Sequence, residues 1–404
     1  MDMWSAPPRL TNDGAFMADP VPAYSAWRRE AAVHRTTTPD GSPVWLVTRY
    51  GDVRSALTDS RLSLAKSVSR VGYRGFALPP ALDANLLNMD PPDHTRLRRL
   101  VSKAFTARKI ESMRQQVQHV TDQLLDAVPT DGPVDLIAAL AAPLPMIIIG
   151  DLLGVPDRDR ENFRSWANAL LVPNQAGPVT PARAVDHLQD LLSTLIATHR
   201  TSPDGTLLSD LVRVRDAGDE LSEDELTSLA FLILLAGYET TVHLIGNGIV
   251  TLLQHPRELD RLRRDPSLVP LAVEEVMRFA APNPYAIRRF ARQDFAIGGA
   301  QIRAGDTVLL LLAAAHRDPD RFTNPDELDI TRIDNGHLGF GHGIHYCLGA
   351  PLARLQAQTA IGSVLTRFPH LRLAVAVDEL QWRASFRSRG LLALAVTTTP
   401  SRTP

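Results

Sequence analysis

The sequence predicts a mainly α-helical fold with small β-sheets. Apolar residues recur at helical spacing over five long segments, at 107–128, 135–153, 157–172, 181–200 and 222–254. Stretches rich in strand-forming residues are shorter and lie toward the two ends of the chain, at 44–48, 282–311 and 371–398. Long helices combined with few, short strands indicate that the sheets are a minor part of the structure.

The composition is that of a globular protein. Of 404 residues, 44% are hydrophobic and 22% are charged, and the net charge is −2. A chain of this size can bury a cofactor completely, and its near-neutral charge gives no support for nucleic-acid binding. Residues 1–22 show neither a signal-peptide pattern nor the apolar run of a membrane anchor, so a cytoplasmic protein is expected. Length alone would allow two or three domains.

The start of the chain is predicted to be an irregular lead over residues 1–40, with one short helix at 24–30. The β-rich stretch 44–48 comes next. A helix is then expected from Tyr50, with Asp52 as its cap.

Two segments have the character of lids. Periodicity is poor from 60 to 87, where two glycines and two prolines interrupt it, and a loop this long in a compact domain is usually functional. Between the helical segments, Pro173, Gly177, Pro178 and Pro181 predict a hinge-like connection of the kind found in access lids.

A basic helix is expected after Pro91 and Pro92, and Asp93 can cap it. His94 and Arg98 are four residues apart and therefore share one helical face. A basic surface helix would explain this pattern. Two donors on one face would equally suit two carboxylates.

The longest helix begins at a capping box formed by Ser222 and Glu225, and runs to about Gln254. Its length of roughly 45 to 50 Å is enough to cross a whole domain. The middle of the helix, 231–236, is apolar all round and is predicted to be buried.

Polar residues follow directly in this helix. Gly237, Glu239 and Thr240 break the local rules for a buried helix, and such positions are where function is expected. Thr240 can donate its hydroxyl to the carbonyl of Ala236, four residues back. A buried helix with a self-satisfied threonine is the alternative explanation.

Further candidates lie in the second half of the chain. Glu275 and Arg278 are three apart on a short amphipathic helix with apolar surroundings, and Glu274 is in the wrong register to join them. Arg288 and Arg289 enter a strand together and must point to opposite faces, so only one can face an interior site. The segment 371–398 is expected to form closing β-hairpins.

Cys347 is the only cysteine, so it forms no disulfide within the chain. A lone cysteine is usually an inert apolar residue. Here it lies among several glycines, and a helix with Pro351 in its first turn is expected to begin directly after it. A sulfur at a helix N-terminus is in a position where backbone N–H groups favour the thiolate.

This region resembles the cysteine-ligand loop of the cytochromes P450, whose pattern is Phe-Gly-x-Gly-x-His-x-Cys-x-Gly. Every fixed position is filled, by Phe340, Gly341, Gly343, His345, Cys347 and Gly349. The resemblance implies a haem b whose iron is held by the Cys347 thiolate, with Phe340, Gly341 and Gly349 contacting the cofactor.

The segment from Ala236 to Thr241 is similar to the oxygen-activation segment of the distal helix in this family. The resemblance implies that Ala236 and Gly237 contact the haem. It also implies that Glu239 and Thr240 relay protons to dioxygen.

Further roles follow from the resemblance. The residues implied to bind the haem propionates are His94, Arg98, Arg289 and His345, with Arg288 as the runner-up to Arg289. Glu275, Arg278 and Arg332 match a buried network that supports the cysteine loop without a catalytic part. His316 stands where the family has Asn, a departure expected to lie away from the chemistry.

The resemblance runs from about Trp45 to the end of the chain and implies a single cytochrome P450 domain over 1–404. It implies a monooxygenase that hydroxylates or epoxidises an apolar secondary metabolite such as a macrolide, polyketide, terpenoid or steroid. Electrons must come from elsewhere, since no Rossmann fingerprint or iron–sulfur cysteine cluster is present. A ferredoxin and its NAD(P)H-dependent reductase are therefore the implied partners.

The substrate pocket is expected to have an apolar lining. Its candidate residues are Leu86, Leu87, Leu232, Ile233, Ile287 and Phe386. Two other functions stay open, a haem-thiolate peroxygenase that uses hydrogen peroxide and a non-catalytic haem-binding sensor.

Overall fold

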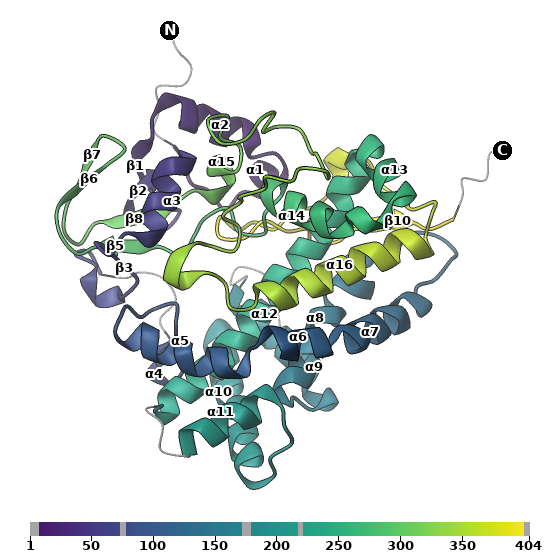
Figure 1. The fold of residues 1–404 in the computed structure, drawn as a ribbon, viewed down its shortest axis with the longest axis horizontal. Coiled ribbons are helices and arrows are strands. Elements are labelled where there is room, and N and C mark those ends of the chain that lie inside the picture. Colours follow the sequence, from purple (N-terminus) through teal and green to yellow (C-terminus); the bar gives the residue numbers. More distant parts are fainter. Residues whose placement is uncertain (1–7, 73–77, 172–178, 217–220, 400–404) are drawn as a thin grey trace.

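A computed structural model describes residues 8–72, 78–171, 179–216 and 221–399. Helices fill most of the molecule, and the largest sheet lies at one side of them (Figure 1). The mainly α-helical class with small sheets is confirmed.

The helices in the described part are α1 (Gly14–Ala18), α2 (Val21–Glu30), α3 (Tyr50–Thr58), η1 (Lys66–Val68), α4 (Pro80–Asp83), α5 (Asp93–Ala104), α6 (Ala107–Ser112), α7 (Arg114–Asp126), η2 (Ile137–Ala141), α8 (Pro143–Leu153), α9 (Asp157–Leu171), α10 (Pro181–Thr201), α11 (Leu207–Asp216), α12 (Glu223–Gln254), α13 (Pro256–Arg264), η3 (Pro266–Leu268), α14 (Val269–Phe279), α15 (Leu312–Ala315), η4 (Gly343–His345), α16 (Ala350–Arg367) and η5 (Val377–Glu379). The strands are β1 (Val33–Thr37), β2 (Pro43–Val47), β3 (Leu62–Ser63), β4 (Val134–Asp135), β5 (Arg289–Ala291), β6 (Phe295–Ile297), β7 (Ala300–Ile302), β8 (Thr307–Leu310), β9 (Arg372–Leu373) and β10 (Ala395–Thr397).

The prediction of an irregular lead over 1–40 was right only in part: the expected short helix at 24–30 lies within α2, but α1 and β1 were not expected. Residues 1–7 lie outside the described residues, but α1, α2 and β1 follow them. Strand β1 pairs antiparallel with β2, with Val33 opposite Val47. Four of its five residues are polar, and two of these, His34 and Thr36, are buried, so the strand offers no apolar run for a sequence search to find.

The main sheet has the order β1-β2-β8-β5-β3, in which only β2 and β8 are parallel. The sheet joins three strands from residues 33–63 with two strands from residues 289–310. It places β5, which begins at Arg289, in the interior. The antiparallel pairing expected within 371–398 is present, because β9 pairs with β10 and Trp382 forms an antiparallel bridge with Leu391. Strand β10 lies between β4 and β9, so the C-terminal segment closes against a strand from the first half of the chain.

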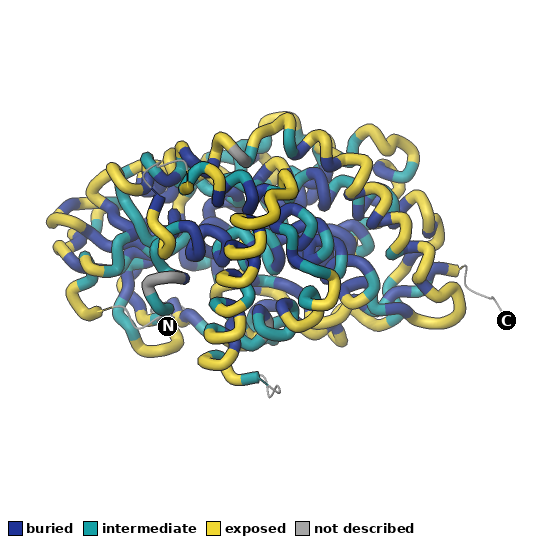
Figure 2. Tube along the Cα trace, turned by 90° about the horizontal axis from the view of Figure 1, so that it is seen from below, coloured by how far each residue is buried: buried dark blue, intermediate teal, exposed yellow. Residues whose placement is uncertain are grey.

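Helix α12 is the core of the helical part, and it packs against α4, α8, α10, α14 and α16. The predicted capping box is present at its start, and both predicted ends are correct. By length and composition α12 could cross a membrane, yet most of it is buried inside the protein. Buried segments gather in the interior of the molecule (Figure 2).

One prediction for α12 was too simple. In the stretch 231–236, Phe231 and Leu234 are buried, but Ala236 is exposed and the other three residues are only partly covered. An all-apolar segment therefore keeps one open face here, at the point where the polar residues begin.

Several local boundaries also differ from expectation. Asp52 lies inside the first turn of α3, and α5 begins at Asp93 with no side-chain cap. The loop 60–87 contains β3, η1 and α4, while 73–77 lies outside the described residues. Residues 173–178 of the predicted hinge also lie outside the described residues, and Pro181 is the first residue of α10.

Candidate active site

The cysteine loop is held in a tight conformation by its own backbone. The amide of Cys347 donates to the carbonyl of Phe340 at 2.8 Å. Gly341 and Gly343 have φ values of 77° and 73°, a left-handed region that other residues rarely adopt. Helix α16 then begins at Ala350, so the chain presents the cysteine at a helix N-terminus as predicted.

The pKa of the Cys347 thiol is raised, whereas a helix N-terminus was expected to favour the thiolate. Cys347 is exposed on one side, but many protein atoms surround its sulfur, and this burial raises the pKa of the thiol. The amides of Gly349 and Ala350 and the charge of Arg98 lower the pKa without reversing the net shift. The helix N-terminus alone therefore does not ionise the sulfur. A bound metal ion would do so, since a coordinating thiol is deprotonated outright.

Four basic side chains converge beside this loop. The rings of His94 and His345 lie 4.2 Å apart between centroids, and Arg289 is only 3% exposed. Burial, followed by the charges of His94 and Arg289, lowers the pKa of His345 to about 3. Burial also lowers the pKa of Arg289 to about 10. Arg98 is partly buried and completes the predicted set.

This cluster has little compensating negative charge among the described residues. His94 is 1% exposed, and neither ring nitrogen has a hydrogen-bond partner among the described residues. The one carboxylate that favours the charged form of both histidines is that of Asp90. Buried polar atoms without partners are costly, so the cluster fits a ligand that carries carboxylates.

The side chains of Arg288 and Arg289 have different partners, as expected for neighbouring residues entering a strand. Arg289 donates to the backbone carbonyls of Ile287 and Leu57, at 3.0 and 3.5 Å. Arg288 instead donates to the side chain of Asn88 at 3.3 Å. Only Arg289 belongs to the basic cluster.

In α12, the predicted bond from the Thr240 hydroxyl to the Ala236 carbonyl is present at 2.8 Å. The absent side chain of Gly237 would lie 2.5 Å from Ile149, so this glycine lets α8 pack closely against α12. That packing is the role the structure gives to Gly237.

Glu239 has partners that the sequence analysis missed. Its carboxylate accepts hydrogen bonds from Arg383 at 3.2 Å and from Ser388 at 3.3 Å, and His243 lies 3.5 Å away. Burial raises the pKa of Glu239, but His243 and Arg383 outweigh this and lower it overall. His243 could have been found from its spacing of four residues, whereas nothing local in the sequence indicates Arg383.

The predicted pocket residues divide into two groups. Leu87, Leu232, Ile233 and Ile287 are partly covered. Leu86 is 6% exposed and belongs to the main hydrophobic core, so it is a packing residue.

Phe386 packs edge-on against Tyr285, with the ring centroids 6.0 Å apart. It lies against a small core cluster that also contains Tyr24 and Trp27. Phe386 therefore lies against the aromatic cluster around Tyr285.

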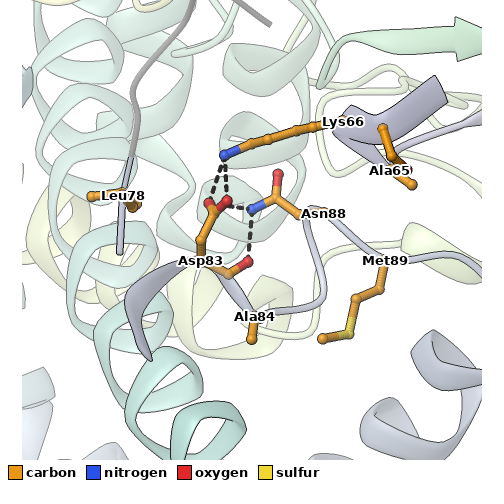
Figure 3. A pocket seen from close by; sticks show the side chains of 8 residues that line it. Ala65, Lys66, Leu78, Asp83, Ala84, Asn88 and Met89 are labelled. Atoms are coloured by element: carbon orange, nitrogen blue, oxygen red, sulfur yellow. Dashed lines mark hydrogen bonds and ion pairs between the residues drawn. The ribbon is translucent and has the colours of Figure 1, made fainter. Parts of the chain in front are cut away.

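A pocket of about 350 Å³ lies between η1 and α4 (Figure 3). Lys66 and Asp83 form an ion pair across it, with the shorter contact at 2.5 Å, and Asn88 also donates to Asp83. None of the six predicted substrate residues lines this pocket. Asn88 connects it to Arg288.

The predicted buried network is present on α14. Glu275 and Arg278 are fully buried and form two hydrogen bonds of 2.8 Å. Arg332 approaches Glu275 to 3.3 Å. Arg278 also donates to the carbonyl of His316, and the ring of His316 accepts from the amide of Leu338. His316 was expected to lie away from the chemistry, but it connects the network to the cysteine loop.

Glu274 does not pair with Arg278, as its register predicted. It accepts two hydrogen bonds from Arg354 of α16, at 2.6 and 2.8 Å, and one from His337 at 3.0 Å. Burial raises the pKa of Glu274, but the bonds from Arg354 and His337 outweigh it and lower the pKa to about 2.

This shift makes a prediction for stability at acid pH. A carboxylate whose pKa is lower in the folded state stabilises the protein above its unfolded value, here 4.5, and loses that effect as the pH falls towards about 2. We expect the difference in free energy of unfolding between the native protein and Glu274→Gln to be smaller at about pH 3 than at about pH 5. Urea unfolding at the two pH values measures it. An equal difference at both would contradict the assignment.

Comparison with known proteins decides the family. A sequence model described as Cytochrome P450 matches residues 182–378. The chain is 44% identical over 409 residues to Cytochrome P450 107B1 from Saccharopolyspora erythraea, covering 98% of this chain and 99% of that protein. This chain belongs to the cytochrome P450 family.

Other P450 relatives agree with this. The Vitamin D(3) 25-hydroxylase of Pseudonocardia autotrophica is 46% identical over 388 residues, covering 96% of both chains. The structure of P450 monooxygenase TamI with tirandamycin C bound is 45% identical, with a TM-score of 0.89, and covers 97% of this chain and 100% of that one. The protein is thus a P450 monooxygenase, an enzyme that binds haem through a cysteine thiolate and uses dioxygen and redox partners.

Proposed function

We propose that this P450 hydroxylates or epoxidises an apolar, medium-to-large secondary metabolite of the macrolide, polyketide, terpenoid or steroid kind. The observation that carries the haem assignment is the basic cluster around His94, which has only partial compensation and lies beside the only cysteine of the chain. The substrate class is supported by the relatives, one a hydroxylase of vitamin D(3) and one solved with tirandamycin C bound. We further propose that the whole chain, 1–404, is one P450 domain, and that it acts in the cytoplasm.

The chain's own residues supply the binding site for the haem. Cys347 would hold the iron, and the carboxylates of the haem would pair with the basic cluster, His94, Arg98, Arg289 and His345. Ala236 and Gly237 would cover one face of the ring, and Phe340, Gly341 and Gly349 the other. Thiolate-ligated haem supplies the activation of dioxygen, because the thiolate favours cleavage of the O–O bond.

Around that site, the protein controls protons and water. The Thr240 hydroxyl bonds to the Ala236 carbonyl and can pass a proton on from α12. Glu239 would act as a relay that takes up a proton and passes it towards Thr240, since His243 and Arg383 lower its pKa and leave its carboxylate ionised at neutral pH. The hydrogen bonds from Arg383 and Ser388 to Glu239 must break before its carboxylate can turn towards Thr240. The apolar residues before Ala236 would limit the access of bulk water to the bound haem.

Electrons would come from a ferredoxin reduced by an NAD(P)H-dependent reductase, because the sequence has no flavin or nicotinamide fingerprint and no iron–sulfur cysteine cluster. A spectral screen of candidate metabolites against the haem-loaded enzyme would identify the substrate, since displacement of an iron-bound water changes the spin state.

The decisive test compares turnover with ferredoxin, reductase and NAD(P)H against turnover with hydrogen peroxide. We expect product with the electron donors, and about a tenfold or larger loss of product per NAD(P)H consumed in Thr240→Ala, because positioned proton transfer typically contributes about 100-fold or more. Equal activity with peroxide that survives Thr240→Ala would indicate a peroxygenase. Substrate binding without product under either condition would indicate a sensor.

A further inference from the structure

We propose that Glu274, His337, Tyr346 and Arg354 form an outer clamp that holds the cysteine loop from both sides and keeps Cys347 in position to bind iron. In this clamp Arg354 is a positioning residue. The proposal rests on the proposed function, because it concerns the haem ligand assigned there.

The clamp is centred on the contact between α14 and α16. Arg354 donates from Nε to one oxygen of Glu274 at 2.6 Å and from Nη2 to the other at 2.8 Å. The side chains are 28% and 24% exposed, so the pair is largely shielded from water. A two-pronged arginine–carboxylate pair fixes orientation as well as distance.

From this centre the clamp reaches the beginning of the loop. His337 Nε2 lies 3.0 Å from Glu274, and its Nδ1 accepts from the amide of Gly339 at 3.2 Å. These two bonds require one tautomer, in which Nε2 carries the proton and donates to Glu274. The backbone before Phe340 is therefore tied to α14.

The clamp also reaches the residue next to the cysteine. Arg354 donates from Nη1 to the Tyr346 hydroxyl at 3.0 Å, and its guanidinium lies 4.4 Å from the centre of the Phe340 ring. Tyr346 is 38% exposed and Ile344 is 51% exposed. The backbone bonds of the loop fix its turn, and the bond from Arg354 adds a constraint on the side chain of Tyr346, whose ring has only Phe340 as an aromatic neighbour among the described residues.

The outer clamp is separate from the inner network of Glu275, Arg278 and Arg332. Glu274 and Glu275 are adjacent, yet they have no arginine partner in common. Within the described residues, the inner network reaches the loop through His316 and Leu338, and Asn335, just before the loop, donates to Glu275 at 2.9 Å. Loss of the outer clamp should therefore loosen 339–347 while the inner network and the core remain intact.

The test uses the haem-loaded protein and Arg354→Gln, with Arg367→Gln as the matched control. Arg367 is on the same helix, but it pairs with the exposed Asp126, a residue more than 200 positions before the loop. Two quantities are measured, amide hydrogen exchange in 339–347 relative to α12, and the rate at which the reduced carbon monoxide complex loses its thiolate-type absorption on warming. Neither depends on substrate turnover.

We expect both rates to rise about tenfold or more in Arg354→Gln, the effect of losing charge-assisted hydrogen bonds, and to stay within about twofold of native in Arg367→Gln. Tyr346→Phe removes only the hydroxyl and should accelerate both rates to a smaller extent; it serves as the test should Arg354→Gln not fold. Rates unchanged in the folded variants, or an equal rise in α12, would overturn the clamp. Absence of the thiolate-type absorption in the native protein would instead overturn the proposed function.

Discussion

We expect Cys347→Ala to abolish the thiolate-type absorption of the reduced carbon monoxide complex and all monooxygenase turnover. No other cysteine exists to replace the ligand, so the loss should be complete. The protein should nevertheless fold, because Cys347 is exposed and lies outside the hydrophobic core. Residual haem is also expected, since the basic cluster around His94 and Arg289 remains to bind carboxylates.

Absorption spectra and circular dichroism of the same samples separate ligand loss from unfolding. Cys347→Ser is the matched control, because it keeps the size of the side chain and its contacts with the amides of α16 while removing the sulfur. It should lose the thiolate-type absorption as fully as the alanine variant. If Cys347→Ala keeps that absorption, the haem-thiolate assignment fails.

The second large effect is expected for Arg278→Ala. Arg278 and Glu275 are both fully buried, so removal of the arginine leaves a buried carboxylate without its strongest partner. Breaking such a pair costs on the order of 3 to 5 kcal/mol of folding free energy. The carbonyls of His316, Pro325 and Glu327 lose their donor as well. Urea unfolding monitored by circular dichroism measures the loss.

A second pair in the same protein supplies the control. Glu161 and Arg164 have the same residue types and the same spacing of three, but their side chains are 75% and 39% exposed. Arg164→Ala should therefore cost less than about 1 kcal/mol. Similar losses in the two variants would mean that burial of the pair on α14 has no special structural role.

Predictions that depend on atoms close in sequence agree with the structure. Helix α12 begins at the predicted capping box and ends where predicted. The Thr240 hydroxyl bonds to the Ala236 carbonyl, because the donor and acceptor are one helical turn apart in any helix. The hydrogen bond between Glu275 and Arg278 likewise follows from their spacing of three residues on one helix.

Predictions that depend on burial or on distant partners fared differently. Leu86 is buried in the main core, and Ala236 is exposed within an apolar stretch. Glu239 is tied to Arg383, 144 residues later, across a contact that no local pattern indicates. The helix N-terminus at Cys347 favours the thiolate, yet burial raises the pKa of the thiol more strongly.

The amino-acid sequence by itself determined the family resemblance, the long helix and the identity of the groups that do the chemistry. These follow from residue type and short spacing, which the backbone converts directly into geometry. Only the tertiary structure decided which charges are compensated. Three features depend on which helices and strands pack together: the basic cluster at His94, the hydrogen bonds to Glu239, and the clamp between Glu274 and Arg354. Burial and long-range pairing are properties of that packing.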